Sequence, residues 1–147
     1  MHGDLALVEG ALEGRAQREG LIVTGITAME QWITDQLERG LAGFDQRAAQ
    51  DCATLAKRLV DAKAGGLANR ISALPAALFR VPEDQRPLMA ARALAAAYLI
   101  GQAYTRQDSL PELLRADVRQ AVGWNVTREA LIEDAGLLRV DGRWRVL

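Results

Sequence analysis

The chain has 147 residues, of which 50% are hydrophobic and 25% are charged, and its net charge is −1. This length suits one domain with a real core, and the composition is that of an ordinary globular protein. Bases exceed acids between Lys57 and Arg92, but no segment is basic enough to predict a nucleic-acid-binding surface from charge alone.

The single cysteine, Cys52, excludes a disulfide within the chain and is typical of a reducing compartment. The N-terminal residues lack the basic start and the apolar run of a signal peptide. The longest apolar stretch, Leu88 to Ala103, contains Arg92 and is mostly alanine, which indicates a buried helix and not a membrane span. We therefore expect a cytoplasmic protein with no membrane contact.

Residues 1–20 predict a flexible or partly helical N-terminal arm, because glycines recur through this segment. A helical bundle domain is expected over residues 21–135. Its first helix is predicted to begin near Thr24 or Thr27 and to end near Arg39, where apolar residues recur at helical spacing. The stripe consists of Ile26, Met29, Trp32, Ile33 and Leu37.

The second helix is predicted from Gln46 to Ala64, with Asp45 as its N-cap. Gly65-Gly66 predicts the end of this helix, since a residue with positive φ commonly follows a helix. The predicted buried face consists of Ala48, Ala49, Cys52, Leu55, Ala56, Leu59 and Val60.

A third helix is predicted from Leu67 to Leu74, and Pro75 allows a break after it. Pro87 suits the first turn of a long helix that reaches about Thr105. Because this helix is apolar on nearly every face, it is predicted to be central in the bundle.

The next helix is predicted to begin near Pro111, with Asp108-Ser109 as its cap, and to end at Gly123. Trp124 is expected to fasten that end to the bundle. The residues expected to face inward are Leu113, Leu114, Val118 and Val122.

A last short helix is predicted to open at residues 127–129, and residues 136–147 predict a β-hairpin around Asp141-Gly142. A lone hairpin is marginal in water, so this one should pack on the helices or pair with strands outside the chain. The predicted fold is therefore an all-α bundle of about five or six helices with a small C-terminal β-hairpin.

The sequence offers little chemistry. A metal site needs several converging ligands, and the chain has one histidine, His2, and one cysteine, Cys52, which is expected to be a small core residue. It contains no nucleophile elbow and no phosphate-binding glycine loop. We expect no metal, no cofactor and no enzymatic activity.

The possible interaction surface consists of Arg139, Arg143, Trp144 and Arg145. An Arg-Trp-Arg strand can stack on nucleobases, with Lys57 and Arg58 in support, but it can equally cover a bundle with its tryptophan. The structural interpretation is favoured, as it is for Trp32 on the first apolar stripe. A small-molecule pocket near Tyr98 and Tyr104 is a weaker alternative.

Five segments carry a resemblance to a known family, and their order and spacing make it more specific than any segment alone. They are MEQWITDQLERGLA (29–42), LAKRLVDAKAGGLANRI (55–71), the alanine-rich helix from Leu88, LPELLRADVRQAVGW (110–124) and GRWRVL (142–147). From about Arg15 onward the chain resembles the helical region downstream of the zinc finger in bacterial SWIM-type proteins.

The zinc motif of that family, C-x-C followed by C-x-H, has no counterpart here, so the resemblance implies no zinc ligand in this chain. It implies one helical module of the family, as a short paralogue or a fragment of a longer product. SWIM fingers are presumed to bind DNA or proteins, and bacterial members are often encoded beside MoxR-type AAA+ ATPases and von Willebrand A-domain proteins. The resemblance therefore implies a protein-interaction or scaffold module in such a system.

Overall fold

The computed structural model describes residues 2–124, 137–140 and 143–146. Within them lie five α-helices, two 3-10 turns and two short strands. The helices are α1 (His2–Arg39), α2 (Phe44–Asp61), α3 (Gly65–Phe79), α4 (Arg86–Thr105) and α5 (Glu112–Val122); the 3-10 turns are η1 (Glu83–Gln85) and η2 (Gln107–Ser109). The expectation of a helical bundle is confirmed by residues 2–124.

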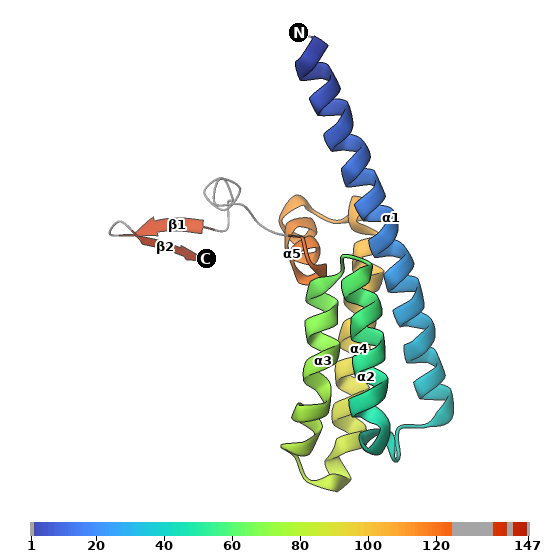
Figure 1. Cartoon of the computed structure of the whole chain (residues 1–147). Helices are drawn as coiled ribbons and strands as arrows, with labels where there is room; N and C mark the ends of the chain where they lie inside the picture. Colours follow the sequence, from blue (N-terminus) through green and yellow to red (C-terminus); the bar gives the residue numbers. More distant parts are fainter. Residues whose placement is uncertain (1, 125–136, 141–142, 147) are drawn as a thin grey trace.

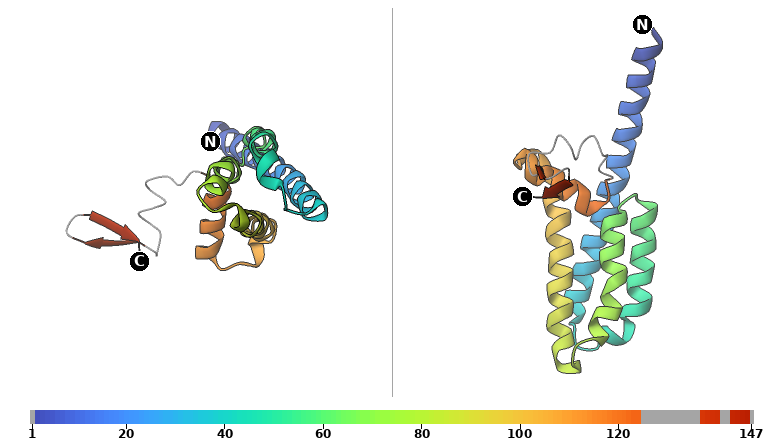
Figure 2. Two further views of the ribbon diagram at one scale, coloured as in Figure 1. Left: turned by 90° about the horizontal axis from the view of Figure 1, so that it is seen from below. Right: turned by 90° about the vertical axis from the view of Figure 1, so that its left-hand side faces the viewer.

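The four long helices run alternately up and down, and α5 lies across one end of the bundle (Figures 1 and 2). Helix α1 packs against α2 and α4, while α3 packs between α2 and α4 on the side of the bundle away from α1. Up-and-down topology with short connections is the simplest arrangement of an antiparallel bundle. Helix α4 contacts α1, α2, α3 and α5, but Leu88 and Leu99 on it are 57% and 65% exposed, so the central place predicted for it is only partly correct.

The core is built from one apolar stripe on each long helix. Helix α1 contributes Ile22, Ile26, Met29 and Ile33, all at most 2% exposed. Trp32 is partly buried against this core, with its ring edge-to-face to Phe44 at a centroid distance of 6.1 Å, as the structural interpretation predicted. Helices α2, α3 and α4 add Leu55, Leu59, Leu67, Ile71, Leu78, Leu94 and Tyr104.

The predicted start of the first helix is wrong, because α1 begins at His2 and not near Thr24 or Thr27. Glycine in a helix interior costs about 1 kcal/mol but does not forbid the helix. Residues 6–17 are all exposed and extend beyond the bundle (Figure 1), and we call residues 2–17 the projecting segment. The proposed division of the chain into an arm, a bundle and a hairpin stays a prediction.

The residue that ends α2 also differs from the prediction. The positive φ that follows this helix belongs to Lys63, at 66°, whereas Gly65-Gly66 begins α3. Asp45 is not the N-cap either: α2 starts at Phe44 after Gly43, and Asp45 lies in its first turn. Ala49 and Val60 are exposed, so the predicted buried face was two residues too wide.

Proline has different effects in the next two helices. Helix α3 continues through Pro75 to Phe79, so no break occurs there. Pro87 lies in the first turn of α4, as predicted. In α5 the predicted inward face is only partly correct, since Val122 is buried but Leu113 and Leu114 are each 51% exposed. This short helix contacts α3 and α4 along one side only.

Helix α5 starts after Pro111, and no side chain caps it. The predicted capping role of Asp108-Ser109 is therefore wrong. Beyond α5, strands β1 (Leu137–Val140) and β2 (Arg143–Val146) pair antiparallel. The predicted turn Asp141-Gly142 and the predicted short helix from residue 127 lie outside the described residues. Packing of the strand pair on the bundle stays a prediction. In the described part of the chain, no helix is long and apolar enough to cross a membrane.

Candidate interaction surfaces

A shallow apolar groove follows the line where α3 and α4 meet. One hollow in it, of about 460 Å³, is lined by α3, α4 and the turn between them, and a second, of about 480 Å³, continues it toward α5. Both share Leu74, Ala77 and Ala93, so they form one groove. Its remaining lining residues are Gly66, Asn69, Arg70, Ala73, Val81, Gln85, Leu88, Met89, Arg92 and Ala121.

The groove is apolar along its floor and positively charged at its rim. Leu88, one of the lining residues, is 57% exposed. Arg70 and Arg92 are the charged residues of the lining, which contains no carboxylate. In the described part of the chain, neither guanidinium lies in an ion pair.

Small side chains give the groove its shape. Ala73, Ala77 and Ala93 let another backbone come closer than larger residues would allow. A groove between two helices with an apolar floor and charged rims is the usual receptor for an amphipathic helix. Exposed apolar side chains gathered in this way are typical of a partner surface.

The projecting segment is the second unpartnered apolar surface. Leu7, Val8 and Leu12 on it are 74%, 54% and 60% exposed. Glu9 and Glu13 follow Val8 and Leu12 directly, so carboxylates lie beside the apolar residues. Between residues 4 and 14 the sequence contains acids and no base.

The base of the projecting segment is held by α5 and Trp124. The indole Nε1 of Trp124 donates a hydrogen bond to the Tyr104 hydroxyl at 2.9 Å, and the guanidiniums of Arg18 and Arg119 lie 4.1 Å and 4.4 Å from its ring centroid. Arg119 also pairs with Glu19 at 2.9 Å, and Arg18 donates to the Gly123 carbonyl at 3.1 Å. The role predicted for Trp124 is thus confirmed, and this cluster fixes the direction in which α1 leaves the bundle.

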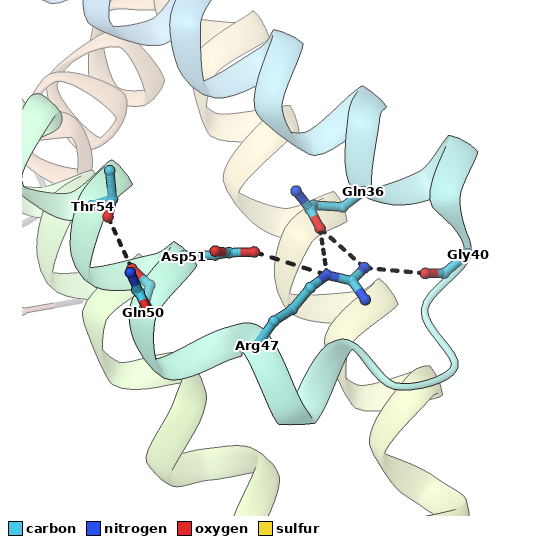
Figure 3. A network of polar contacts seen from close by, with 6 residues as sticks. All are labelled: Gln36, Gly40, Arg47, Gln50, Asp51 and Thr54. Atoms are coloured by element: carbon cyan, nitrogen blue, oxygen red, sulfur yellow. Dashed lines mark hydrogen bonds and ion pairs between the residues drawn. The ribbon is translucent and has the colours of Figure 1, made fainter.

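A polar cluster fastens α1 to α2 at the opposite end (Figure 3). Gln36 is only 3% exposed, and its Oε1 accepts hydrogen bonds from both Nε and Nη2 of Arg47 at 3.2 Å and 3.1 Å. Arg47 Nη2 also donates to the Gly40 carbonyl, and Asp51 lies 3.8 Å from Arg47 Nε. The buried amide is satisfied by a charged donor, which makes this a structural cluster.

The residues predicted as an interaction surface are placed by strand register alone. Arg139 is opposite Trp144, Val140 opposite Arg143, and Leu138 opposite Arg145. Their side chains lie outside what the structure describes, so the surface stays a prediction. Lys57 and Arg58, offered in support of nucleic-acid binding, are both exposed on α2.

The other candidate residues have structural surroundings. Cys52 is fully buried, and burial together with the carboxylate of Asp51 raises the pKa of its thiol to about 11. Tyr104 is buried under Trp124, and neither it nor Tyr98 lines the groove. Among the described residues, no group of three or more His, Cys, Asp or Glu is placed to hold a metal ion.

The groove and the projecting segment were not recognised from the sequence. Ala73 and Ala77 lie four residues apart on α3, but the third helix was predicted to end at Leu74, so the sequence did not place them on one face. The glycines near the N-terminus predict a flexible arm, so the leucines between them are not assigned to a helix face. The available signal was the combination of small residues on α3 and α4 with large apolar ones, Leu88 and Met89, on the same line.

Comparison with known proteins adds one family. The model of the SWIM-associated four-helix bundle domain matches residues 17–122, which begins where the projecting segment ends and finishes with α5. No curated protein and no solved structure matches the chain.

Proposed function

Since the chain belongs to the family of the SWIM-associated four-helix bundle domain, we propose that it is a non-catalytic helical module that binds another protein through the α3–α4 groove. The observation that carries this proposal is the apolar floor of the groove, open to solvent and flanked by Arg70 and Arg92. An amphipathic helix with acidic residues beside its apolar stripe has the complementary chemistry.

A non-catalytic role is supported by the chemistry that the described side chains make available. Cys52 is buried with a raised pKa, so its thiol is protonated at neutral pH and out of reach of a substrate. The polar clusters around Arg47, Arg86 and Arg119 contact helix ends and neighbouring helices, and their groups hold the bundle together.

The proposed partner is a component of a MoxR-type ATPase and von Willebrand A-domain system, as the family resemblance implies. The test is binding of the purified chain to the MoxR-type ATPase and the A-domain protein of the same host, measured by calorimetry. Leu88→Glu with Arg92→Glu should weaken binding at least about tenfold, because truncating or reversing central interface residues costs more than 1.4 kcal/mol.

The matched control is Leu99→Glu, since Leu99 is 65% exposed on the same helix but does not line the groove. Equal binding by the wild type and the groove variant would show that the partner does not bind in the groove. No binding by the wild type to either protein would exclude these partners.

Nucleic-acid binding is the second candidate, because the strand register sets Arg139 directly opposite Trp144, with Arg143 and Arg145 on either side of the tryptophan in sequence. This role requires binding to single-stranded DNA or RNA that weakens as salt rises. Replacing Trp144 by alanine should then reduce affinity about tenfold or more in a fluorescence titration. Absence of binding by the wild type at low ionic strength would exclude it.

A further inference from the structure

Two unpartnered surfaces of this chain complement each other in shape and in charge. We propose that the projecting segment of one copy binds in the α3–α4 groove of a second copy. The proposal rests on the groove being a docking surface, as proposed above, and it adds a second copy of this chain as an occupant besides the partner protein.

The projecting segment has the features of a helix that needs a partner. Residues 6–17 all belong to the exposed part of the single chain, including Leu7 and Leu12. The segment is a continuation of α1 beyond the bundle, and its three exposed apolar side chains gain from burial against another surface. Glu9 and Glu13 give it a negative charge next to those side chains.

The groove fits this segment in length. Along α3 the lining runs from Gly66 to Ala77, and the rise of an α-helix makes this span about 17 Å. Residues 6–17 of the projecting segment cover the same length, about 17 Å, by the same rise. Arg70 and Arg92 on the rim can then pair with the two glutamates.

The occupant must come from another copy. The projecting segment continues α1 and points away from the bundle (Figure 1), while the groove is lined by α3, α4, the turn between them and the end of α5. An unbroken helix therefore cannot reach the groove of its own chain.

Charge also selects this contact over the symmetric ones. Two projecting segments side by side would bring glutamates together, and two grooves face to face would bring Arg70 and Arg92 together with their counterparts. Like charges in direct contact are unfavourable, whereas segment against groove places opposite charges together. The resulting association is head-to-tail, and it yields a ring or an open chain of copies.

The test uses the full chain and two surface variants, measured by sedimentation from about 1 µM to 1 mM. The segment variant is Val8→Glu with Leu12→Glu, and the groove variant is Leu88→Glu with Arg92→Glu; these residues are exposed, so the fold should persist. The wild type should exceed the 16.0 kDa of one chain as concentration rises, and each variant alone should remain at that mass.

Mixing the two variants supplies the decisive measurement. The segment variant keeps an intact groove and the groove variant keeps an intact segment, so one contact can form and the mixture should reach the mass of two chains and no more. Charge exchange gives an independent check: Glu13→Lys and Arg92→Glu should each weaken self-association about tenfold, and the two changes together should restore it. A double variant that associates no better than the single variants would contradict the proposed pairing of the groove arginines with the segment glutamates. Leu99→Glu should behave as the wild type.

A wild type that stays at the mass of one chain at 1 mM would overturn this proposal, as would self-association that persists in either variant. Mixed variants that do not associate, while the wild type does, would show a different interface. Each of these results leaves the partner-binding proposal standing, provided the groove variant loses the calorimetric binding described above. If the groove variant changes neither partner binding nor self-association, the groove is the site of neither.

Discussion

Gly66 lies where the backbone leaves no room for a larger side chain. A Cβ built there would lie 2.1 Å from the Ala121 carbonyl oxygen, because the start of α3 touches the backbone at the end of α5. Backbone cannot move aside as a flexible side chain can. Gly65, its neighbour, would place a Cβ with nothing within 4 Å.

We therefore expect Gly66→Ala to lower the free energy of unfolding by about 1 to 3 kcal/mol or more, as overpacking of a tight contact does. Gly65→Ala should be close to neutral. Urea denaturation followed by circular dichroism measures both. Equal stability of the two variants would mean that α5 does not pack on α3 as the structure has it.

Cys52 predicts a specific dependence of stability on alkaline pH. Its thiol has a pKa of about 11 in the fold against 9.0 for the unperturbed group, because burial and Asp51 disfavour the thiolate. The unfolded chain therefore loses this proton first, and the stability contribution is fully present below pH 9 and lost as pH rises through 11. Cys52→Ala should show a smaller fall in unfolding free energy between pH 9 and 11.

The same burial predicts slow chemical modification. Iodoacetamide at pH 8 should label the native thiol far more slowly than the urea-unfolded chain, as followed by mass spectrometry. Rapid labelling of the native protein would contradict the placement of Cys52 in the core.

At the scale of single elements, α1 differs most from what propensity suggests. Gly10 and Gly14 lie in the projecting segment, and a Cβ at either position meets nothing within 4 Å. Each glycine weakens the helix by about 1 kcal/mol relative to alanine, and nothing in the single chain requires it.

Gly10→Ala with Gly14→Ala should therefore strengthen the projecting helix by about 2 kcal/mol in total. The expected result is slower amide hydrogen exchange over residues 6–17, with little change in the bundle. Gly40→Ala is the control with the opposite expected effect: Gly40 has a φ of +84°, so alanine there is strained and should destabilise the chain. Unchanged exchange in the double alanine variant would show that the segment's helicity is limited by something other than glycine.

How much of each element the sequence predicts depends on the kind of interaction that sets it. Stripes such as Ile26-Met29-Ile33 identify helices because a buried face repeats every turn. Caps and turns are harder to predict. At Lys63 a non-glycine residue has positive φ, whereas Gly66 lies inside a helix where a close contact with the backbone of α5 leaves no room for a side chain.

The groove was less predictable still. It depends on which side of α4 remains uncovered once α1, α2 and α3 have packed, and Leu88 and Leu113 look like core residues until that packing is known. Periodicity states that a residue belongs to an apolar face, but not whether a neighbour covers it.

At the scale of the whole molecule, polar clusters hold both ends of the bundle. At the end opposite Trp124, Arg86 Nη1 lies 3.1 Å from Asp45 Oδ2, and its Nε donates to the Leu78 and Val81 carbonyls. One side chain thus joins α2, the end of α3 and the start of α4.

We expect Arg86→Lys to destabilise the whole bundle by about 1 to 3 kcal/mol, since an ammonium cannot reproduce the planar fork that serves a carboxylate and two carbonyls. Thermal unfolding should show a lower Tm in a single transition. Arg80→Lys is the control, because Arg80 is exposed at the same end of the molecule. A Tm unchanged within error would mean that these contacts contribute little in solution.

The continuity of α1 also has a geometric consequence. Because one helix runs from the core out to the projecting tip, the number of residues between Leu12 and Ile26 fixes the direction in which Leu12 points around the helix axis. Each inserted residue turns the tip by about 100° and moves it about 1.5 Å. One alanine inserted between Gln17 and Arg18 should misdirect the tip, whereas seven, close to two full turns, should return it to nearly its original heading. The helix thus sets the direction of its exposed tip. Binding that weakens and recovers with the length of such an insertion would show that this direction matters.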